Sequence, residues 1–141
     1  MRLLIIEDSS TMTEVIKNRL LSLGIDDVDT LRDLPKDGDE EYECILCDLG
    51  LLTSSGIDTI IRLRKIYRYT PIVVLTQVED PEIHAGVILA GASSVYLKGC
   101  RAKDILTAIK TAVLVEKKIL NRAYTLIRKA DKSLSEIYSE D

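Results

Sequence analysis

The chain has 141 residues, of which 46% are hydrophobic and 30% charged, and its formal net charge is −4. This length fits one domain, and the composition is that of an ordinary globular protein, which excludes disordered and fibrous chains. The acidic balance argues against a nucleic-acid surface, and no apolar run reaches the roughly 18 residues that a membrane span needs. No targeting signal is visible, so we expect a cytoplasmic protein without membrane insertion or direct nucleic-acid binding.

The first predicted element is a strand over residues 3–6, a short apolar run typical of a central parallel strand that is buried on both faces. Hydroxyl side chains at positions 9–11 then offer N-caps for a helix, and Thr11 and Glu14 have capping-box spacing. Apolar residues at 12, 15, 16, 20 and 23 favour one amphipathic helix, which Gly24 is suited to end.

The second and third strands are predicted at 28–31 and 44–47, and the acidic stretch between them is broken by Pro35 and Gly38. Any helix in residues 32–43 must therefore be short or irregular. Cys44 and Cys47 form a CxxC motif, which in isolation suggests a redox pair or half of a zinc site. Side chains at i and i+3 of a strand point to opposite faces, so we predict that both cysteines pack in the core.

The remaining elements alternate between helix and strand. Ser54, Ser55 and Gly56 open a helix, and residues 71–75 form the clearest strand of the chain. Asp80 and Pro81 are a strong helix start, with Asp as the cap and Pro in the first turn, and the helix should end at Gly91. The single histidine, His84, lies on this helix, where we expect a solvated side chain. A fifth strand covers 95–97.

From about Lys103 to the end, neither Gly nor Pro interrupts a long amphipathic helix. The part beyond about Val115 exceeds what a small α/β domain needs for packing. It either frays in solvent or acts as a connector or coiled-coil seam, although Glu116 and Ser133 fall on that seam. We therefore divide the chain into a domain at 1–115 and a helical extension at 116–141, a candidate connector or homodimerisation segment.

Four polar residues stand directly after apolar strands: Asp8, Asp48, Thr76 and Lys98. Parallel strands all point the same way, so their carboxyl ends meet at one edge of the sheet, where open α/β sheets bind ligands. Singly, each residue is more often a turn, cap or solvated side chain. Together they predict a pocket with a hydroxyl, an ammonium and, counting Glu7, up to three carboxylates.

Such a pocket is suited to phosphoryl capture. Two carboxylates about 4 Å apart repel by about 4 kcal/mol at an effective dielectric of 20, so a cation is needed. Mg²⁺ suits oxygen-rich sites with few protein ligands, and Lys98 and Thr76 can hold phosphoryl oxygens. A carboxylate in line with a phosphoryl group can then become an aspartyl phosphate.

The sequence resembles the response-regulator receiver family over residues 2 to about 115. The resemblance is carried by LLIIEDSS after the first strand, CDLGLLTSSGID around the phosphoacceptor, PIVVLT with its hydroxyl, and GASSVYLKG with its lysine. It implies a doubly wound, flavodoxin-like α/β fold with a five-stranded parallel sheet in the order 2-1-3-4-5, here with an extended C-terminal helix.

The resemblance also implies roles for individual residues. Asp48 would accept a phosphoryl group from a sensor histidine kinase or a phosphotransfer protein. Asp8, Asp48 and the backbone carbonyl of Gly50 would ligate Mg²⁺, with Glu7 assisting through water. Thr76 would then move toward the phosphoryl group and Lys98 would pair with it, so that a partner-binding surface changes conformation. Such a protein is a signalling phosphoacceptor rather than a turnover enzyme.

The sequence departs from the family pattern at two positions that concern the readout. Val95 stands where the family usually has its switch aromatic, while Tyr96 faces the other side of the strand. Gly99 follows Lys98 where proline is most common, so the loop geometry should differ.

Two other functions remain as alternatives. The first is a phosphorylation-independent binding or dimerisation module with the same fold. The second is a Mg²⁺-dependent phosphohydrolase of the haloacid dehalogenase type, but that motif needs a second Asp two residues after Asp8, where this chain has Ser10.

Overall fold

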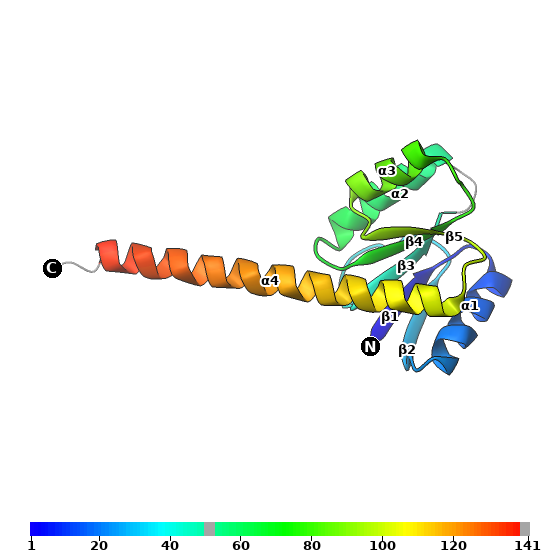
Figure 1. The fold of residues 1–141 in the computed structure, drawn as a ribbon, viewed down its shortest axis with the longest axis horizontal. Coiled ribbons are helices and arrows are strands. Elements are labelled where there is room, and N and C mark those ends of the chain that lie inside the picture. The colour runs from blue at the N-terminus through cyan, green and yellow to red at the C-terminus, as the bar shows by residue number, and fades with distance from the viewer. Residues whose placement is uncertain (50–52, 139–141) are drawn as a thin grey trace.

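The computed structural model describes residues 1–49 and 53–138, with side chains at 1–49 and 56–137. Within these residues, five parallel strands form one sheet in the order β2-β1-β3-β4-β5 (Figure 1). This is the predicted order, and it places β3 at the centre. The strands are β1 Arg2–Ile6, β2 Asp27–Leu31, β3 Cys44–Asp48, β4 Ile72–Thr76 and β5 Ser94–Leu97.

Two pairs of helices cover the two faces of the sheet. On one face, α1 and α4 pack over alternate strand residues, and on the other face α2 and α3 pack over the rest (Figure 1). The central strands β1, β3 and β4 are buried on both faces, which explains why they are continuous apolar runs rather than alternating ones. The helices are α1 Ser10–Ser22, α2 Thr53–Ile66, α3 Pro81–Ala90 and α4 Ala102–Tyr138.

The two cysteines of the CxxC motif lie on opposite faces of β3, as predicted. Cys44 belongs to the core under α1 and α4, and Cys47 to the core under α2 and α3. Both are buried and free, and burial raises the pKa of each thiol to about 12. They therefore behave as small hydrophobic side chains.

Three local signals for the helices have different outcomes. Asp80 caps α3 by accepting from the Glu82 N–H at 2.9 Å, and Gly91 ends it with a φ of +127°. The Thr11 capping box is wrong, because Ser9 is the N-cap of α1 and accepts from the Met12 N–H at 3.3 Å. Ser9 stands one residue before the helix, where its extended backbone can aim the hydroxyl at the helix end.

Residues 32–43 run without a helix from β2 to β3, which confirms the prediction of an irregular segment. Arg2 holds this segment in place, because its Nη1 lies 2.9 Å from Glu40 Oε2 and its carbonyl accepts from the Glu43 N–H at 2.9 Å. Tyr42 adds a 2.7 Å hydrogen bond to Asp29 Oδ2.

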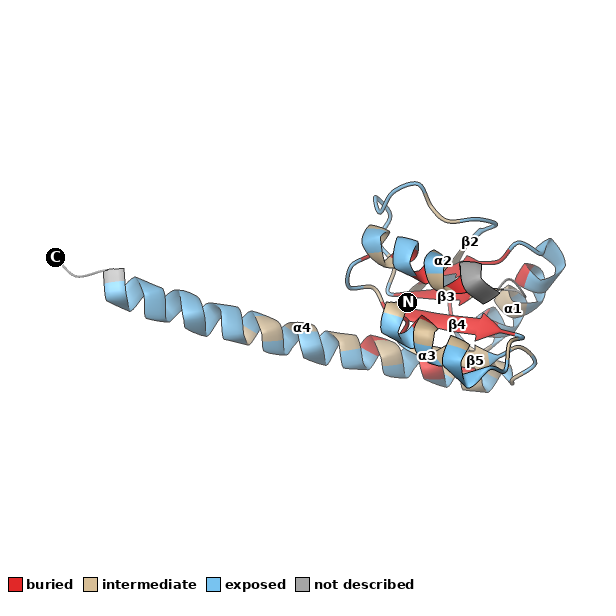
Figure 2. Ribbon diagram, turned by 90° about the horizontal axis from the view of Figure 1, so that it is seen from above, coloured by how far each residue is buried: buried red, intermediate tan, exposed pale blue. Residues whose placement is uncertain are grey.

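Helix α4 is one continuous helix of 37 residues, and its later turns extend well beyond the rest of the domain (Figure 1). Its first turns pack on the sheet through Ile105, Ala108, Ile109 and Val113. Beyond Val113 no residue up to 137 is buried, and most are exposed (Figure 2). No helix in the described part of the chain combines the length and apolar character that crossing a bilayer requires.

Candidate functional site

The carboxyl edge of the sheet gathers four of the predicted residues. Asp48 ends β3 and Thr76 ends β4, while Glu7 and Lys98 directly follow β1 and β5. Lys98 Nζ lies 2.7 Å from Asp48 Oδ2 and 4.0 Å from Glu7 Oε2. Parallel pairing of β1, β3 and β4 aligns these strand ends, so the sheet itself positions the acids and the ammonium.

The two carboxylates nearest Lys98 are almost completely removed from water. Only 2% of the Asp48 side chain and 2% of the Glu7 side chain are exposed, against 18% for Lys98. Glu7 Oε1 accepts from the Ser9 N–H at 3.0 Å, but Oε2 has no hydrogen-bond donor in the described structure. Burial, reinforced by the carboxyl groups of Asp48 and Asp8, raises the pKa of Glu7 to about 8.

Asp8 and Gly50 complete the predicted metal set. Asp8 follows Glu7 at the same edge but is exposed, and its carbonyl oxygen accepts from Arg32 Nη2 at 3.2 Å. The structure thus distinguishes a buried acid, Glu7, from an exposed one, Asp8. Gly50 lies outside the described residues.

Thr76 is buried beside the acids, with 3% of its surface exposed. Its Oγ1 accepts from the Val78 N–H at 3.1 Å, which fixes the loop that follows β4. The hydroxyl hydrogen is not used in that bond, so Thr76 can still donate to an incoming oxygen atom.

The loop after Lys98 is built on Gly99. Gly99 has a φ of +93°, and no cis peptide occurs among the described residues. The Lys98 N–H donates to the Thr76 carbonyl at 2.9 Å, and the Cys100 N–H donates to the Leu97 carbonyl at 3.3 Å. A left-handed glycine therefore turns the chain here, as the departure from proline led us to expect.

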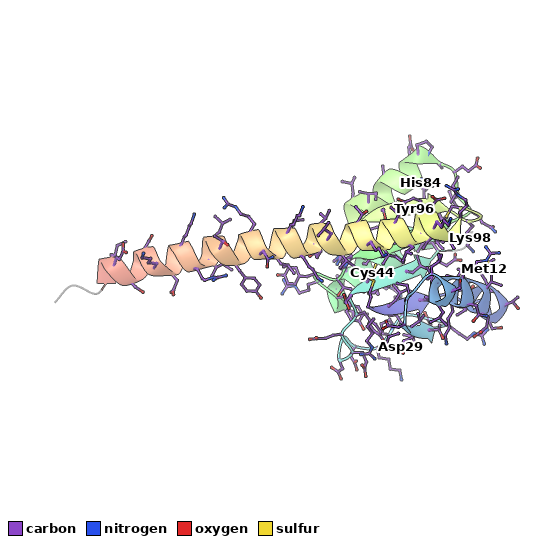
Figure 3. The ribbon with its side chains drawn as sticks, turned by 60° about the horizontal axis from the view of Figure 1, so that its bottom comes forward. Met12, Asp29, Cys44, His84, Tyr96 and Lys98 are labelled. Atoms are coloured by element: carbon purple, nitrogen blue, oxygen red, sulfur yellow. The ribbon has the colours of Figure 1, made fainter. Side chains whose placement is uncertain are left out.

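An apolar cleft of about 240 Å³ opens beside Asp48 and Lys98, between α1 and the start of α4. Met12 and Val15 stand at its α1 side with 39% and 41% of their surface exposed. Sequence periodicity placed both on the core face of α1, and only the packing showed that they border the site. Figure 3 labels Met12 close to Lys98. The cleft is also lined by Ile16, Arg19, Leu20, Leu75, Gly99, Cys100, Ala102 and Ile105.

The oxygen donors of the pocket suit a divalent cation. Two buried carboxyl groups lie beside Lys98, and among the described residues Glu7 Oε2 has no hydrogen-bond donor. The described side chains form no preassembled group of three or more metal-ligating residues. Mg²⁺ does not need one, because it keeps several waters and takes one or two carboxylates together with phosphate oxygens. The residues present therefore fit Mg²⁺.

The sequence predictions for Val95, Tyr96 and His84 have different outcomes. Val95 packs with the core under α2 and α3 and Tyr96 with the core under α4, so they face opposite ways as predicted. The prediction for His84 is wrong, because its ring Nε2 lies 2.5 Å from the Val78 carbonyl oxygen and the side chain is half-buried. Val78 is six residues away along a loop, and periodicity gives no information on such a contact.

A family model described as the response regulator receiver domain matches residues 3–110. The chain belongs to this family. Phosphoryl acceptance is the general role of receiver domains, and the expected resemblance is confirmed. The matched range runs from β1 through β5 and ends within α4, so the extension at 116–141 lies beyond it.

Curated relatives include two transcriptional regulators and a chemotaxis protein. The cell cycle transcriptional regulator CtrA of Caulobacter vibrioides is 30% identical over 118 residues, which cover 80% of this chain and 50% of CtrA. The Streptococcus agalactiae regulator DltR is 29% identical, covering 78% of this chain and 50% of DltR. A Campylobacter jejuni CheY homolog is 32% identical over 83 residues, 54% of this chain and 64% of the homolog. The chain spans about half the length of the two transcriptional regulators.

Solved structures confirm the fold. A CheY-like receiver domain protein from Methanospirillum hungatei superposes with a TM-score of 0.72 at 22% identity, covering 83% of this chain and 96% of that one. The receiver domain of the Pseudomonas aeruginosa sensor histidine kinase PA1611, solved with magnesium in its active-site cleft, gives 0.67 at 22% identity, covering 79% and 96%.

Proposed function

We propose that this receiver domain accepts a phosphoryl group on Asp48 in a Mg²⁺-dependent reaction and thereby switches a partner-binding surface. The observation that carries the proposal is the buried Asp48 carboxylate held 2.7 Å from Lys98 Nζ at the carboxyl edge of the sheet. The domain then acts stoichiometrically, as a cytoplasmic signalling phosphoacceptor rather than a turnover enzyme.

Asp48 acts as the nucleophile in this reaction. One of its carboxylate oxygens forms a bond to phosphorus while the bond between phosphorus and a donor histidine nitrogen breaks, and the nitrogen leaves with the bonding pair. Lys98 stabilises the negative charge on the transferred oxygens, and the Thr76 hydroxyl can donate to one of them.

Asp8 and Asp48 would hold Mg²⁺ directly, with Glu7 assisting through water. When bound, the ion neutralises phosphoryl charge and orients the group for in-line transfer. Glu7 must lose its proton to assist, so its raised pKa makes metal binding compete with protons.

The proposed donor is a histidine kinase or phosphotransfer protein. The apolar cleft beside Asp48, with exposed Met12 and Val15 on α1, offers a docking surface next to the nucleophile. Such apolar surface at the rim of a reactive group is what a transient protein partner can cover.

Treatment with a small acyl-phosphate donor and Mg²⁺ tests the proposal. Intact mass should show one alkali-labile phosphoryl group on the wild-type chain and none on Asp48→Asn. The matched control is Asp58→Asn, which removes an exposed carboxylate on α2 that pairs with Arg62 in the same helix at 3.0 Å. This control should label normally, whereas an unlabelled wild-type chain that still binds Mg²⁺ would refute the assignment.

A phosphorylation-independent binding module is the second candidate, and Val95 favours it. Val95 offers no ring to turn as Thr76 moves, and Tyr96 points to the α4 side instead. The discriminating measurement is hydrogen exchange of α3, β5 and α4 with and without the acyl-phosphate donor. A labelled domain whose exchange is unchanged would leave the acceptor chemistry intact but remove the switch.

A further inference from the structure

Helix α4 carries an unpartnered apolar stripe beyond the domain. Its large members are exposed to between 48% and 63%. Steps of three and four residues keep the positions on one side of the helix, and the repeat from Val115 to Leu126 to Ile137 follows the 11-residue period of a nearly straight rod. We call the following set the apolar stripe: Val115, Ile119, Ala123, Leu126, Ala130, Leu134 and Ile137.

Basic side chains occupy much of the rest of the same segment. Lys117 and Arg128 lie opposite the stripe at helical spacing, whereas Arg122 and Lys129 flank it, and Arg128, Lys129 and Lys132 line a common surface with Thr125. The long flanking side chains can extend toward water at the edge of a contact made through the stripe. The basic residues are Lys117, Lys118, Arg122, Arg128, Lys129 and Lys132.

The shape of the molecule restricts what can cover the stripe. At the domain end, Ile119 and Val115 line a groove whose other wall includes Ser94 and Tyr96 of β5. A flat bilayer laid on the stripe would run into this wall, although a basic amphipathic helix alone would suit a lipid surface. A partner helix, roughly 10 Å across, is narrow enough to lie beside the domain.

We infer that the apolar stripe binds the same stripe of a second copy of this chain in an antiparallel arrangement. Small and large side chains alternate along its middle, from Ala123 to Leu134, and antiparallel pairing centred near residue 128 sets each alanine opposite a leucine. Leu126 of one copy faces Ala130 of the other, and Ala123 faces Leu134. The inner layers then have similar volume, Ile119 and Ile137 pair at the two ends, and the contacts are reciprocal, as two-fold symmetry requires.

A parallel pair lacks these advantages. In register, it would stack leucine on leucine and alanine on alanine, so layers would alternate between wide and narrow. It would also bring both domains to the same end of the rod. The antiparallel pair instead sets the domains at opposite ends, as the extension projects from one end of the domain (Figure 2).

The contact area is sufficient for a reversible dimer. Residues 119–137 span about 28 Å at 1.5 Å per residue, and half the circumference of a helix about 12 Å across gives roughly 500 Å² per copy. The total of about 1,000 Å² is the size at which an interface becomes specific, below that of tight complexes. The inference does not depend on phosphoryl chemistry, and the stripe lies beyond the residues that match the receiver family.

Sedimentation equilibrium of the full chain across micromolar concentrations is the first test. The wild type should approach twice the mass of the chain, and Leu126→Ser should weaken the dimer by about tenfold or more through loss of a buried leucine from two layers. Leu114→Ser is the matched control, because Leu114 is 55% exposed on the same helix but lies off the stripe. It should leave the dimer unchanged.

Orientation is tested by disulfide trapping in a Cys100→Ser background, where Cys44 and Cys47 are buried. Antiparallel pairing predicts that Leu126→Cys and Ala130→Cys chains crosslink with each other when mixed, and much less with themselves. Self-crosslinking of each variant alone would overturn the arrangement.

Three further outcomes would overturn the inference. One is a monomeric wild type at all concentrations, and another is a dimer that Leu126→Ser leaves unchanged. The third is sedimentation of the wild type with phosphatidylglycerol vesicles that Leu126→Ser abolishes, which would assign the stripe to lipid. Circular dichroism of each variant confirms that the domain is folded, since position 126 lies outside its core.

Discussion

The two ends of the same parallel strands carry clusters of opposite charges, and the clusters differ in their contact with water. At the amino end, Arg2 lies 3.0 Å from Asp29 and 2.9 Å from Glu40, with the acids 43% and 65% exposed. At the carboxyl end, Lys98 meets Asp48 and Glu7 with each acid only 2% exposed (Figure 3 labels Asp29 and Lys98).

This difference separates a structural cluster from a reactive one. Solvent and hydrogen bonds satisfy the amino-end groups, where the guanidinium of Arg2 also lies 4.9 Å from the Tyr42 ring centre. Burial at the carboxyl end raises the pKa of Glu7 to about 8, and the carboxyl groups of Asp48 and Asp8 add to the shift. A buried carboxyl group with a strongly shifted pKa beside specific charged partners is typical of functional sites.

Replacing the basic side chain at each end, Lys98 or Arg2, should change the free energy of unfolding the most, and by unequal amounts. Lys98→Met leaves buried acids without their ammonium and should lower the free energy of unfolding by about 2–4 kcal/mol at pH 8, and by less at pH 5, where Glu7 is protonated. Arg2→Met should cost clearly less, because water replaces its partners. Urea unfolding measures both losses, and equal values would contradict the contrast.

The second-largest expected effect is the change in stability with pH that the titration of Glu7 causes. Folding raises its pKa from 4.5 to about 8, so the folded state binds this proton more tightly than the unfolded state. The resulting stability is fully present below pH 4.5 and is lost as pH rises through about 8. The loss is a few kcal/mol at most, since a tenfold change in proton affinity corresponds to about 1.4 kcal/mol.

The Glu7→Gln variant checks this assignment. It should be more stable than the wild type at pH 8 and similar near pH 4.5, as measured by unfolding across that range. The control is Glu14→Gln, which changes an exposed acid on α1 and should keep the wild-type dependence. If the free energy of unfolding of Glu7→Gln changes with pH in parallel with that of the wild type, a group other than Glu7 causes the pH dependence.

Mg²⁺ bound in the pocket at the carboxyl end should stabilise the buried acids there, which makes the two ends of the strands more alike. At 10 to 100 times its Kd, it should raise the free energy of unfolding by about 1–3 kcal/mol at pH 8, and by less at pH 5, because Glu7 is then protonated and cannot assist. Asp8→Asn should weaken this stabilisation, whereas Asp29→Asn at the amino end should not. If the stabilisation by Mg²⁺ survives Asp8→Asn but is lost in Asp29→Asn, the ion binds at the amino end, which contradicts the proposed site.

The smallest effect is expected at the amino end. Tyr42→Phe removes the 2.7 Å hydrogen bond to Asp29 and should cost about 0.5–1.5 kcal/mol. Phosphoryl labelling of Asp48 should be unchanged in this variant, as measured by intact mass. Loss of labelling without unfolding would mean that the two ends are coupled.

Local sequence predicted much of this molecule because short-range physics sets it. Apolar runs located β1, β3 and β4, and Asp80, Pro81 and Gly91 bounded α3 through caps that need only neighbouring residues. The opposite faces of Cys44 and Cys47 follow from strand alternation alone. The convergence of Asp48, Thr76 and Lys98 follows from parallel strand ends, once the sheet is inferred.

Tertiary structure decided the features that depend on distant parts of the chain. Arg64 on α2 donates to the Thr70 carbonyl at 2.7 Å and the Gly91 carbonyl at 2.5 Å, and no pattern in the sequence announces these bonds. Which of the adjacent acids is buried, Glu7 or Asp8, likewise depends on how α1 and β5 close over the edge of the sheet. Sequence alone supplied the reactive groups, and packing set their exposure to water, because desolvation depends on every neighbour that folding brings near.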